Sequence, residues 1–308
     1  MSDVVVERLP PDEAFELLAH ETRFRILEVL LEADGRLPFS ELRERTGVRD
    51  PGQFNYHLGK LTGRFVVKGG KDGDDEDGDE ENEGYRLSGA GMQIVGGVLS
   101  GGYTKEMDAE PVDTGEPCIG CGESMELQFR PGAVRLTCPA CDVDFTDMDV
   151  PPGILEGVDP ADAPAVLDRW LKRLMAVTDH GFCFSCDGQV DKYVFTVDGD
   201  DAPSWVDPDE DEGEAGVRYD CQRCERNWHS DAGIAVLSHP AVVSFLYEHG
   251  VDVRETPLWA HSWLSIHNAS VVQREPLRVD VTIELEEERL VLTLDRSVDL
   301  VETRRESA

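Results

Sequence analysis

The cysteines of this chain constrain its fold more than any other residue type. All eight lie in four Cys-x-x-Cys pairs, and none remains outside a pair. The pairs are Cys118/Cys121, Cys138/Cys141, Cys183/Cys186 and Cys221/Cys224. A tetrahedral structural zinc ion takes four thiolates, which two short Cys-x-x-Cys turns can supply. The pattern therefore predicts two structural zinc ions, each held by four cysteines in a zinc ribbon.

Other uses of paired cysteines fit this sequence less well. Disulfides belong to oxidising compartments, and no apolar signal segment follows Met1. A thioredoxin-type redox centre has one Cys-x-x-Cys, whereas this chain has four. An iron–sulfur cluster stays open as an alternative, because spacing alone does not distinguish it from zinc. The spacing also leaves open whether the pairs close in sequential order or across the two sets.

Charge sets the second constraint on the chain. The 308 residues carry a formal net charge of -35, and most of the cationic residues are Arg. Such acidity is typical of proteins inside salt-accumulating halophilic archaea, where carboxylates keep the surface solvated and salt screens their repulsion. The alternative is binding to a basic partner. Because no run of about 18 apolar residues exists, we expect a cytoplasmic protein with no membrane contact.

The charge is unevenly distributed along the chain. Residues 36–71 contain eight basic and three acidic side chains, although residues 106–308 contain 16 basic and 43 acidic ones. Nine further acidic residues lie in the segment 72–83. A locally basic segment inside a very acidic protein marks a candidate nucleic-acid surface.

Helical patterns dominate the N-terminal third. Apolar spacing predicts a short helix over 11–19 and a second one from about Thr22 that ends at Asp34-Gly35. A third helix is expected over 41–46, with Ser40 as its N-cap and Gly47 as its stop. A fourth helix is expected to follow these three short ones.

The fourth helix is predicted over about 51–62, with Asp50 as N-cap and Pro51 in its first turn. Phe54, Leu58 and Leu61 share one face and should enter the core. The polar candidates for DNA contact are Gln53, Asn55, Tyr56, Lys60 and, just past the helix, Arg64. Gln and Asn can pair with adenine edges in the major groove, and cationic side chains with guanine or phosphate. The plainer alternative is a solvated face on a small helical domain.

A hairpin and a further helix complete the N-terminal pattern. Residues 65–68 and 85–88 are expected as paired strands, with the acidic segment 72–83 at the tip. Ser88 can cap a following helix that extends to Leu99. Several glycines weaken this last helix, so we expect it to pack against another surface, such as a second subunit.

The segments Leu17–Leu27 (LLAHETRFRIL) and Phe54–Leu61 (FNYHLGKL) resemble the ArsR-type winged helix-turn-helix transcriptional regulators. The resemblance covers about the first third of the chain. It implies double-stranded DNA as partner, the helix at 51–62 in the major groove, and a homodimer formed through terminal helices. Two departures matter: residues 1–105 contain no cysteine for metal sensing, and the acidic hairpin tip would repel phosphate.

The remaining two thirds look like an internal duplication. Val134–Cys141 is followed four residues later by Phe145, and Val217–Cys224 four residues later by Trp228. Apolar helical segments follow each set, near Pro164 and near Pro240. We therefore expect an α+β fold with several domains. The expected domains are a winged helix-turn-helix domain over 1–105, zinc ribbons with helices over 112–176 and 177–250, and a closing helix and β-meander over 251–308.

Histidine and tryptophan near the second cysteine set are expected to serve packing. His229 follows Trp228, but four thiolates already complete the predicted zinc site. Trp259, His261 and Trp263 form a cluster for which core packing is the first expectation and a ligand pocket the alternative.

The sequence thus favours a DNA-binding transcriptional regulator whose ribbons bind a partner, a ligand or a second subunit. A winged helix joined to a zinc ribbon also resembles the alpha subunit of the archaeal general transcription factor E. That resemblance implies a transcription-machinery adaptor with little sequence preference. We expect no enzyme, because the sequence has no phosphate-binding loop, open metal site or serine-nucleophile motif.

Overall fold

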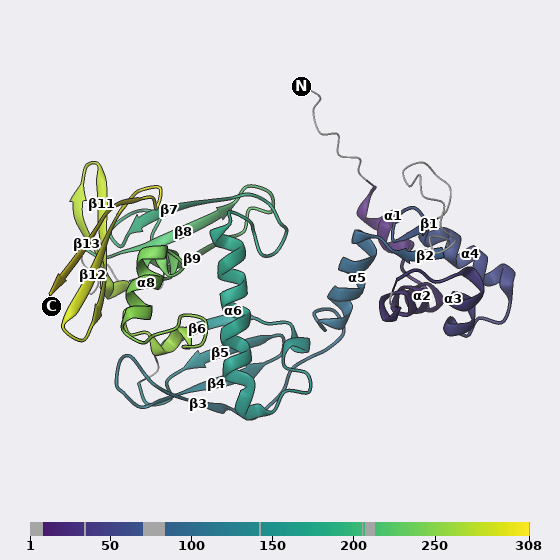
Figure 1. The fold of residues 1–308 in the computed structure, drawn as a ribbon, viewed down its shortest axis with the longest axis horizontal. Helices are drawn as coiled ribbons and strands as arrows, with labels where there is room; N and C mark the ends of the chain where they lie inside the picture. Colours follow the sequence, from purple (N-terminus) through teal and green to yellow (C-terminus); the bar gives the residue numbers. More distant parts are fainter. Residues whose placement is uncertain are drawn as a thin grey trace, which may run out of the picture. The chain divides into compact units, whose positions relative to one another are not determined.

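The computed structural model describes residues 9–33, 35–69, 84–141, 143–204, 206 and 213–307 (Figure 1). The fold is α+β with four antiparallel sheets. The chain separates into two compact units. The N-terminal unit comprises residues 1–106 and 151–153, and the C-terminal unit comprises residues 107–150 and 154–308. The acidic segment 72–83 and the acidic residues 207–212 lie outside the described residues.

The N-terminal unit is a helical group followed by a hairpin and one more helix. Its elements are α1 (Pro11–Glu16), α2 (Glu21–Glu32), α3 (Phe39–Thr46), α4 (Pro51–Leu61), β1 (Val66–Gly69), β2 (Gly84–Leu87) and α5 (Gly89–Leu99). The two strands pair antiparallel, with Val66 opposite Leu87. Ile26 and Leu27 of α2, Leu42 of α3 and Phe54 of α4 have no exposed surface and form the centre of the core.

Local caps explain where several of these helices begin. The Asp50 carboxylate accepts a hydrogen bond from the Gln53 N–H at 2.6 Å, and the Ser88 hydroxyl oxygen accepts one from the Gly91 N–H at 3.1 Å. Both caps confirm the sequence-based expectation, because a cap depends on residues only three positions apart. His20, which the sequence did not indicate, caps α2 by accepting the Thr22 N–H on its Nδ1 at 3.1 Å.

Two predicted helix boundaries are wrong. Ser40 does not cap α3, because the helix already begins at Phe39 and the Leu42 N–H bonds to the Pro38 carbonyl. Pro38 occupies the N-cap position with an extended backbone, and no side chain caps the helix. The first helix ends at Glu16 and not at Ala19, since the backbone must become extended at His20 to begin α2.

The C-terminal unit contains three antiparallel sheets connected by helices. The first sheet is β3 (Val112–Pro117), β4 (Ser124–Arg130), β5 (Ala133–Thr137) and β6 (Asp144–Asp149), in that order. The second is β7 (Val190–Thr196), β8 (Ala215–Cys221) and β9 (Asn227–Asp231). The third is the meander β10 (Ala269–Arg274), β11 (Leu277–Leu285), β12 (Glu288–Asp295) and β13 (Leu300–Ser307).

Helices connect these sheets within the unit. They are α6 (Ala163–Asp179), α7 (Ala232–Val236) and α8 (Pro240–Glu248), with short 3₁₀ turns η3 (Pro160–Asp162), η4 (Leu258–Ala260) and η5 (Ile266–Asn268). A further 3₁₀ turn, η2 (Pro152–Ile154), begins in the residues 151–153 that belong to the N-terminal unit. The long helix α6 runs from the first sheet toward the second (Figure 1). The repeat expected from sequence is therefore unequal: four strands precede a single helix, and then three strands precede two.

A single hydrophobic core joins all three sheets of the C-terminal unit. Leu127 of the first sheet, Val217 of the second and Leu292 of the third have no exposed surface and belong to this core. Trp259 and Trp263 lie in it too, as expected for packing residues. The sheets are too small to bury enough apolar surface alone, but here they share a core, so metal binding is not their only support.

Candidate metal centres and nucleic-acid interface

The eight cysteines form two four-residue groups, each made from two successive pairs. Within each group all four sulfur atoms lie within 4.8 Å of one another. In the first group the Cys118 and Cys141 Sγ atoms are 3.6 Å apart, and in the second group those of Cys186 and Cys221 are 3.5 Å apart. Zinc–sulfur bonds of about 2.3 Å in a tetrahedron place sulfurs about 3.8 Å apart. The observed spacing therefore fits one tetrahedral metal ion in each group.

The four cysteine turns share one backbone pattern. The N–H of the first cysteine donates to a carbonyl five residues later: Cys118 to Glu123, Cys138 to Val143, Cys183 to Gly188 and Cys221 to Arg226, at 2.7 to 2.9 Å. The fourth position after the first cysteine takes a positive φ at Gly122, Asp187 and Glu225. Because all four turns share this hydrogen bond, within each group as well as between the groups, it belongs to the Cys-x-x-Cys turn itself, and the internal duplication stays a prediction from the sequence.

Backbone donors in these turns favour thiolates. The N–H groups of Cys224 and Arg223 lower the pKa of the Cys221 thiol to about 6. In the same group, burial and the neighbouring thiols raise the pKa of Cys186 to about 12. Four thiolates this close repel one another unless a cation lies between them, and a divalent metal supplies that charge. The chemistry of the donor set therefore fits a divalent metal ion such as zinc.

The surroundings of the two groups differ. Beside the second group, the rings of Tyr219 and Trp228 stack at 5.3 Å, and Phe184 packs edge-on against Trp228 at 4.9 Å. The Arg226 guanidinium lies over Phe184, 5.3 Å from the ring centroid. Beside the first group, Phe145 packs edge-on against Trp259 at 6.2 Å, and the aliphatic Ile119 is exposed. The second group therefore has the larger aromatic cluster.

His229 takes no part in the second cysteine group. Its ring packs edge-on against Phe195 at 5.4 Å. Burial, with a contribution from Arg218, lowers its pKa. It is a packing residue, in agreement with the prediction from the completed thiolate set.

The predicted DNA-contacting side chains are gathered at the exposed face of α4 and just beyond it. Gln53, Asn55, Tyr56 and Lys60 are exposed, while Phe54, His57, Leu58 and Leu61 on the other side are buried. At about 100° per residue, Gln53 and Asn55 lie at the two margins of the exposed face, with Tyr56 between them. The Lys60 ammonium lies 5.8 Å from the centroid of the Tyr56 ring. Arg64 is also exposed, and its carbonyl accepts the Ser88 hydroxyl at 2.6 Å.

Cationic side chains near this face stay available to an anionic partner. Within the described part of the chain, Arg43, Arg49, Lys60 and Arg64 form no ion pair. Arg45 differs, because it pairs with Glu41 one turn away on α3. The locally basic character read from the sequence is thus not cancelled by neighbouring carboxylates among these residues.

His57 is a residue of α4 that the sequence reasoning missed. It is 5% exposed, and its ring lies 4.0 Å from that of His20 and 5.3 Å from that of Tyr56. Burial lowers its pKa, with smaller contributions from His20 and Arg23. Its position between Phe54 and Leu61 on the apolar face was the available signal that it packs inward.

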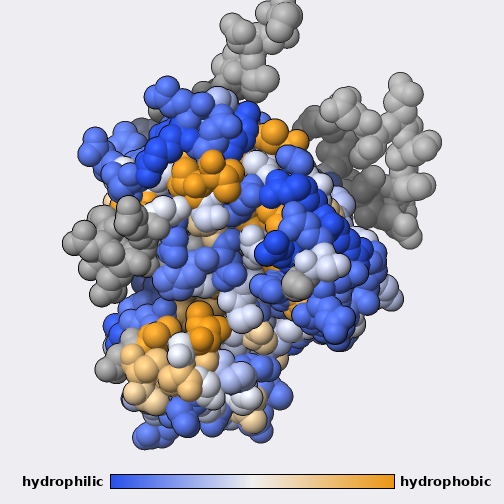
Figure 2. Space-filling model, turned by 90° about the vertical axis from the view of Figure 1, so that its left-hand side faces the viewer, coloured by the Kyte–Doolittle hydropathy of each residue, from blue (hydrophilic) through white to orange (hydrophobic). Residues whose placement is uncertain are grey.

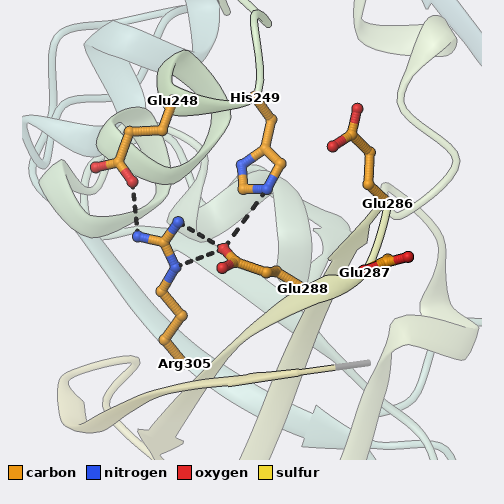
Figure 3. Close-up of a pocket in the computed structure, with 6 residues that line it drawn as sticks. All are labelled: Glu248, His249, Glu286, Glu287, Glu288 and Arg305. Carbon is orange, nitrogen blue, oxygen red and sulfur yellow. Dashed lines mark hydrogen bonds and ion pairs between the residues drawn. The ribbon is translucent and has the colours of Figure 1, made fainter.

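A third polar cluster lies in the C-terminal unit, where α8 ends near the turn between β11 and β12. The hollow has a volume of ≈ 640 Å³ and is lined by Glu248, His249, Glu286, Glu287, Glu288 and Arg305 (Figure 3). Arg305 pairs with Glu248 at 2.7 Å and with Glu288 at 2.6 Å. Among the described residues, only the two cysteine groups bring three or more potential ligands within metal distance. This hollow is therefore an ion-paired junction between α8 and β13.

One face of the protein can be followed in a space-filling view (Figure 2). The face drawn in Figure 2 is largely hydrophilic, with a few separate apolar patches. In the described part of the chain, no helix has the length and apolar character needed to cross a membrane.

Fold and sites together define an α+β protein of two compact units with two four-cysteine groups suited to metal ions. The chain belongs to the family described as domain of unknown function DUF7351, which matches residues 115–300 and so includes both cysteine groups. Residues 11–98, which span α1 to α5, match a second family, domain of unknown function DUF7347. Comparisons with curated proteins and with solved structures found no match.

Proposed function

We propose that this protein is a DNA-binding transcriptional regulator. In this proposal the N-terminal unit is a winged helix-turn-helix domain, with α3 and α4 as the helix-turn-helix and β1 and β2 as the wing. The helix α4 enters the major groove as recognition helix. The family resemblance of Leu17–Leu27 and Phe54–Leu61 to ArsR-type regulators agrees with this assignment.

The observation that carries the proposal is the two-sided character of α4. One side of this helix is buried in the core, and the other presents two amides, a phenol and an ammonium to solvent. Carboxamides discriminate adenine in the major groove, and each good bidentate contact is worth about 1–3 kcal/mol. The basic surroundings add phosphate attraction in a chain whose net charge is otherwise strongly negative.

Exposed apolar side chains on the terminal helices support a homodimer. Phe15 of α1 is 65% exposed, and Met92 and Leu99 of α5 are 52% and 54% exposed. Exposed apolar surface of this kind favours burial against a partner. A two-fold dimer would place two copies of α4 on successive turns of a duplex.

In the same proposal, the C-terminal unit binds two zinc ions as structural ions and serves contacts with a partner protein, an effector or the second subunit. Each zinc ion, when bound, would offset half of the negative charge of four thiolates and hold two turns together. The eight cysteines complete both coordination shells, so no position is left for a substrate, and we propose no enzymatic activity.

Selection of duplexes from a random-sequence pool, at molar salt and with the full chain, tests the proposal. We expect a palindromic motif to be enriched. Asn55→Ala should reduce discrimination at one base position of each half-site by about tenfold or more. Gln93→Ala, an exposed polar residue of α5, is the matched control and should leave the motif unchanged. Unchanged binding of the selected duplex by Asn55→Ala would refute the assignment of the recognition helix.

The nine acidic residues over 72–83 favour a second candidate, an adaptor of the transcription machinery. Such a run repels phosphate and suits contact with a basic protein. Genome-wide crosslinking and immunoprecipitation separates the two functions. Sharp peaks that share a motif support the regulator, whereas broad signal that follows the polymerase at most promoters supports the adaptor.

A further inference from the structure

Gly59 occupies a position of α4 where the fold does not require a glycine. It lies inside the helix, it is exposed, and its φ lies outside the left-handed region. A Cβ built on Gly59 meets no atom within 4 Å. Alanine would therefore fit without strain, and it would favour the helix, because glycine destabilises a helix interior relative to alanine.

Several other glycines of the N-terminal unit have reasons within the fold, whereas Gly89 and Gly96 of α5 have open space for a Cβ as Gly59 does. Gly47 ends α3 with a φ of +76°. A Cβ on Gly91 would come within 2.2 Å of the Phe65 carbonyl oxygen, and one on Gly52 within 3.2 Å of the Asp50 carboxylate that caps α4. Gly59 meets none of these conditions, and unlike Gly89 and Gly96 it lies in α4, the helix that carries the proposed base-reading residues.

The neighbours of Gly59 on the helix surface are the proposed base-reading residues. Asn55 precedes it by four positions and Tyr56 by three, and residues at these spacings adjoin one another on a helix. At about 100° per residue, Gly59 lies between them on the exposed face. The backbone of α4 is therefore not covered by a side chain at Gly59, between the amide of Asn55 and the phenol of Tyr56.

We propose that Gly59 marks the closest approach of α4 to double-stranded DNA, and that the absence of a side chain there serves binding and not folding. This inference rests on the proposed function and adds one residue that determines how deeply the helix enters the groove. Glycine allows a backbone to approach a ligand closely, because no Cβ intervenes. The cationic Lys60 and Arg64 beyond it favour a duplex over an acidic protein surface as the occupant.

The test compares the full-length wild type with Gly59→Ala and Gly59→Gln, using the duplex that the wild type selects from a random pool. Both variants should slow amide hydrogen exchange of α4 several-fold, since each is a better helix former than glycine. Gly59→Ala should bind the duplex about tenfold more weakly, and Gly59→Gln more weakly still. Gly89→Ala, at an exposed position of α5 with open space for a Cβ, should leave DNA affinity unchanged.

The possible results distinguish failure of the proposed function from failure of the inference about Gly59. If the wild type enriches no motif from the random pool, the proposed function is wrong, and the inference about Gly59 is wrong as well. If the wild type binds the selected duplex and Gly59→Ala binds it equally tightly, the role of Gly59 is overturned and the proposed function is not. Faster amide exchange in Gly59→Ala also overturns it, because the fold itself would then require the glycine. Weaker DNA binding together with slower exchange is the result that the proposal requires.

Discussion

The two units of this protein are held together in different ways. The described N-terminal unit contains no cysteine and is built on a core of its own from α2, α3, α4 and the hairpin. The C-terminal unit contains all eight cysteines and three small sheets whose apolar faces meet in one core. One unit therefore depends on side-chain packing alone, and the other combines packing with two sites suited to metal ions.

Charge follows the same division. Residues 36–71 are net basic, whereas residues 106–308 have 43 acidic and 16 basic side chains. Surface carboxylates in such numbers repel one another, and salt shortens the range of that repulsion. Most acidic side chains thus belong to the C-terminal unit, and the net basic segment 36–71 belongs to the N-terminal unit.

The largest effect should come from loss of a cysteine ligand. Cys138→Ser should release one of two bound metal ions and unfold the β3–β6 sheet, because structural zinc contributes about 10 kcal/mol or more in small zinc-binding peptides. The N-terminal unit should stay folded. Metal content and amide exchange of β4 and of α2 measure both parts.

Pro139→Ala is the matched control for Cys138→Ser, since Pro139 is exposed in the same turn and offers no ligand. It should keep both metal ions. Full metal content with cooperative melting in Cys138→Ser would contradict the division between the units.

The corresponding experiment on the N-terminal unit replaces a buried core residue. Phe54 has no exposed surface and contacts Phe39 edge-on at 5.1 Å. Phe54→Ala should cost about 3–5 kcal/mol through lost burial and the cavity that remains. The metal content should stay at the wild-type value. Loss of metal in Phe54→Ala would show that the stability of the two units is coupled, which would contradict their independent stabilisation.

A smaller and pH-dependent effect is expected at Asp231, which precedes α7 in the C-terminal unit. Burial raises its pKa to about 6. The folded unit therefore takes up a proton near pH 6, whereas the unfolded chain does so only near pH 4. Stability from this group is full below about pH 4 and is lost as the pH rises through 6.

Asp231→Asn should therefore stabilise the C-terminal unit at pH 7 by about 2 kcal/mol and remove this part of the pH dependence. Urea unfolding at pH 4.5, 6 and 7.5 measures the effect. Asp299→Asn, at an exposed position, is the control and should change little. Equal pH profiles for wild type and Asp231→Asn would rule out the buried carboxylate as the cause.

The smallest effect belongs to the junction drawn in Figure 3. Arg305 binds Glu248 and Glu288 and lies over the Phe245 ring at 5.1 Å. Because exposed ion pairs contribute little, Arg305→Gln should lower the melting midpoint of the C-terminal unit by less than about 3 °C. Arg296→Gln, which breaks another exposed pair with Asp201, gives the reference value. A much larger loss for Arg305→Gln would mean that this junction holds the meander in place.

Local features of the sequence were predicted best. The caps at Asp50 and Ser88 and the burial of Phe54 and Leu58 depend on residues within a few positions of one another, and the structure confirms them. Ser40 was wrongly expected to cap α3, because the helix already begins at Phe39, with Pro38 at the N-cap position and no side-chain cap. His57 was missed because a histidine between apolar residues gives no local sign of its packing partner, His20.

The sequence by itself determined that eight cysteines form two four-thiolate sets, since short Cys-x-x-Cys turns aim both sulfurs at one point whatever surrounds them. It also determined the two faces of α4, because helical periodicity separates apolar from polar residues. Only the tertiary structure decided that successive pairs close each set and that three sheets share one core. It also decided that Gly59 has open space around it. These outcomes depend on contacts between residues far apart in the chain, which local pattern and composition do not specify.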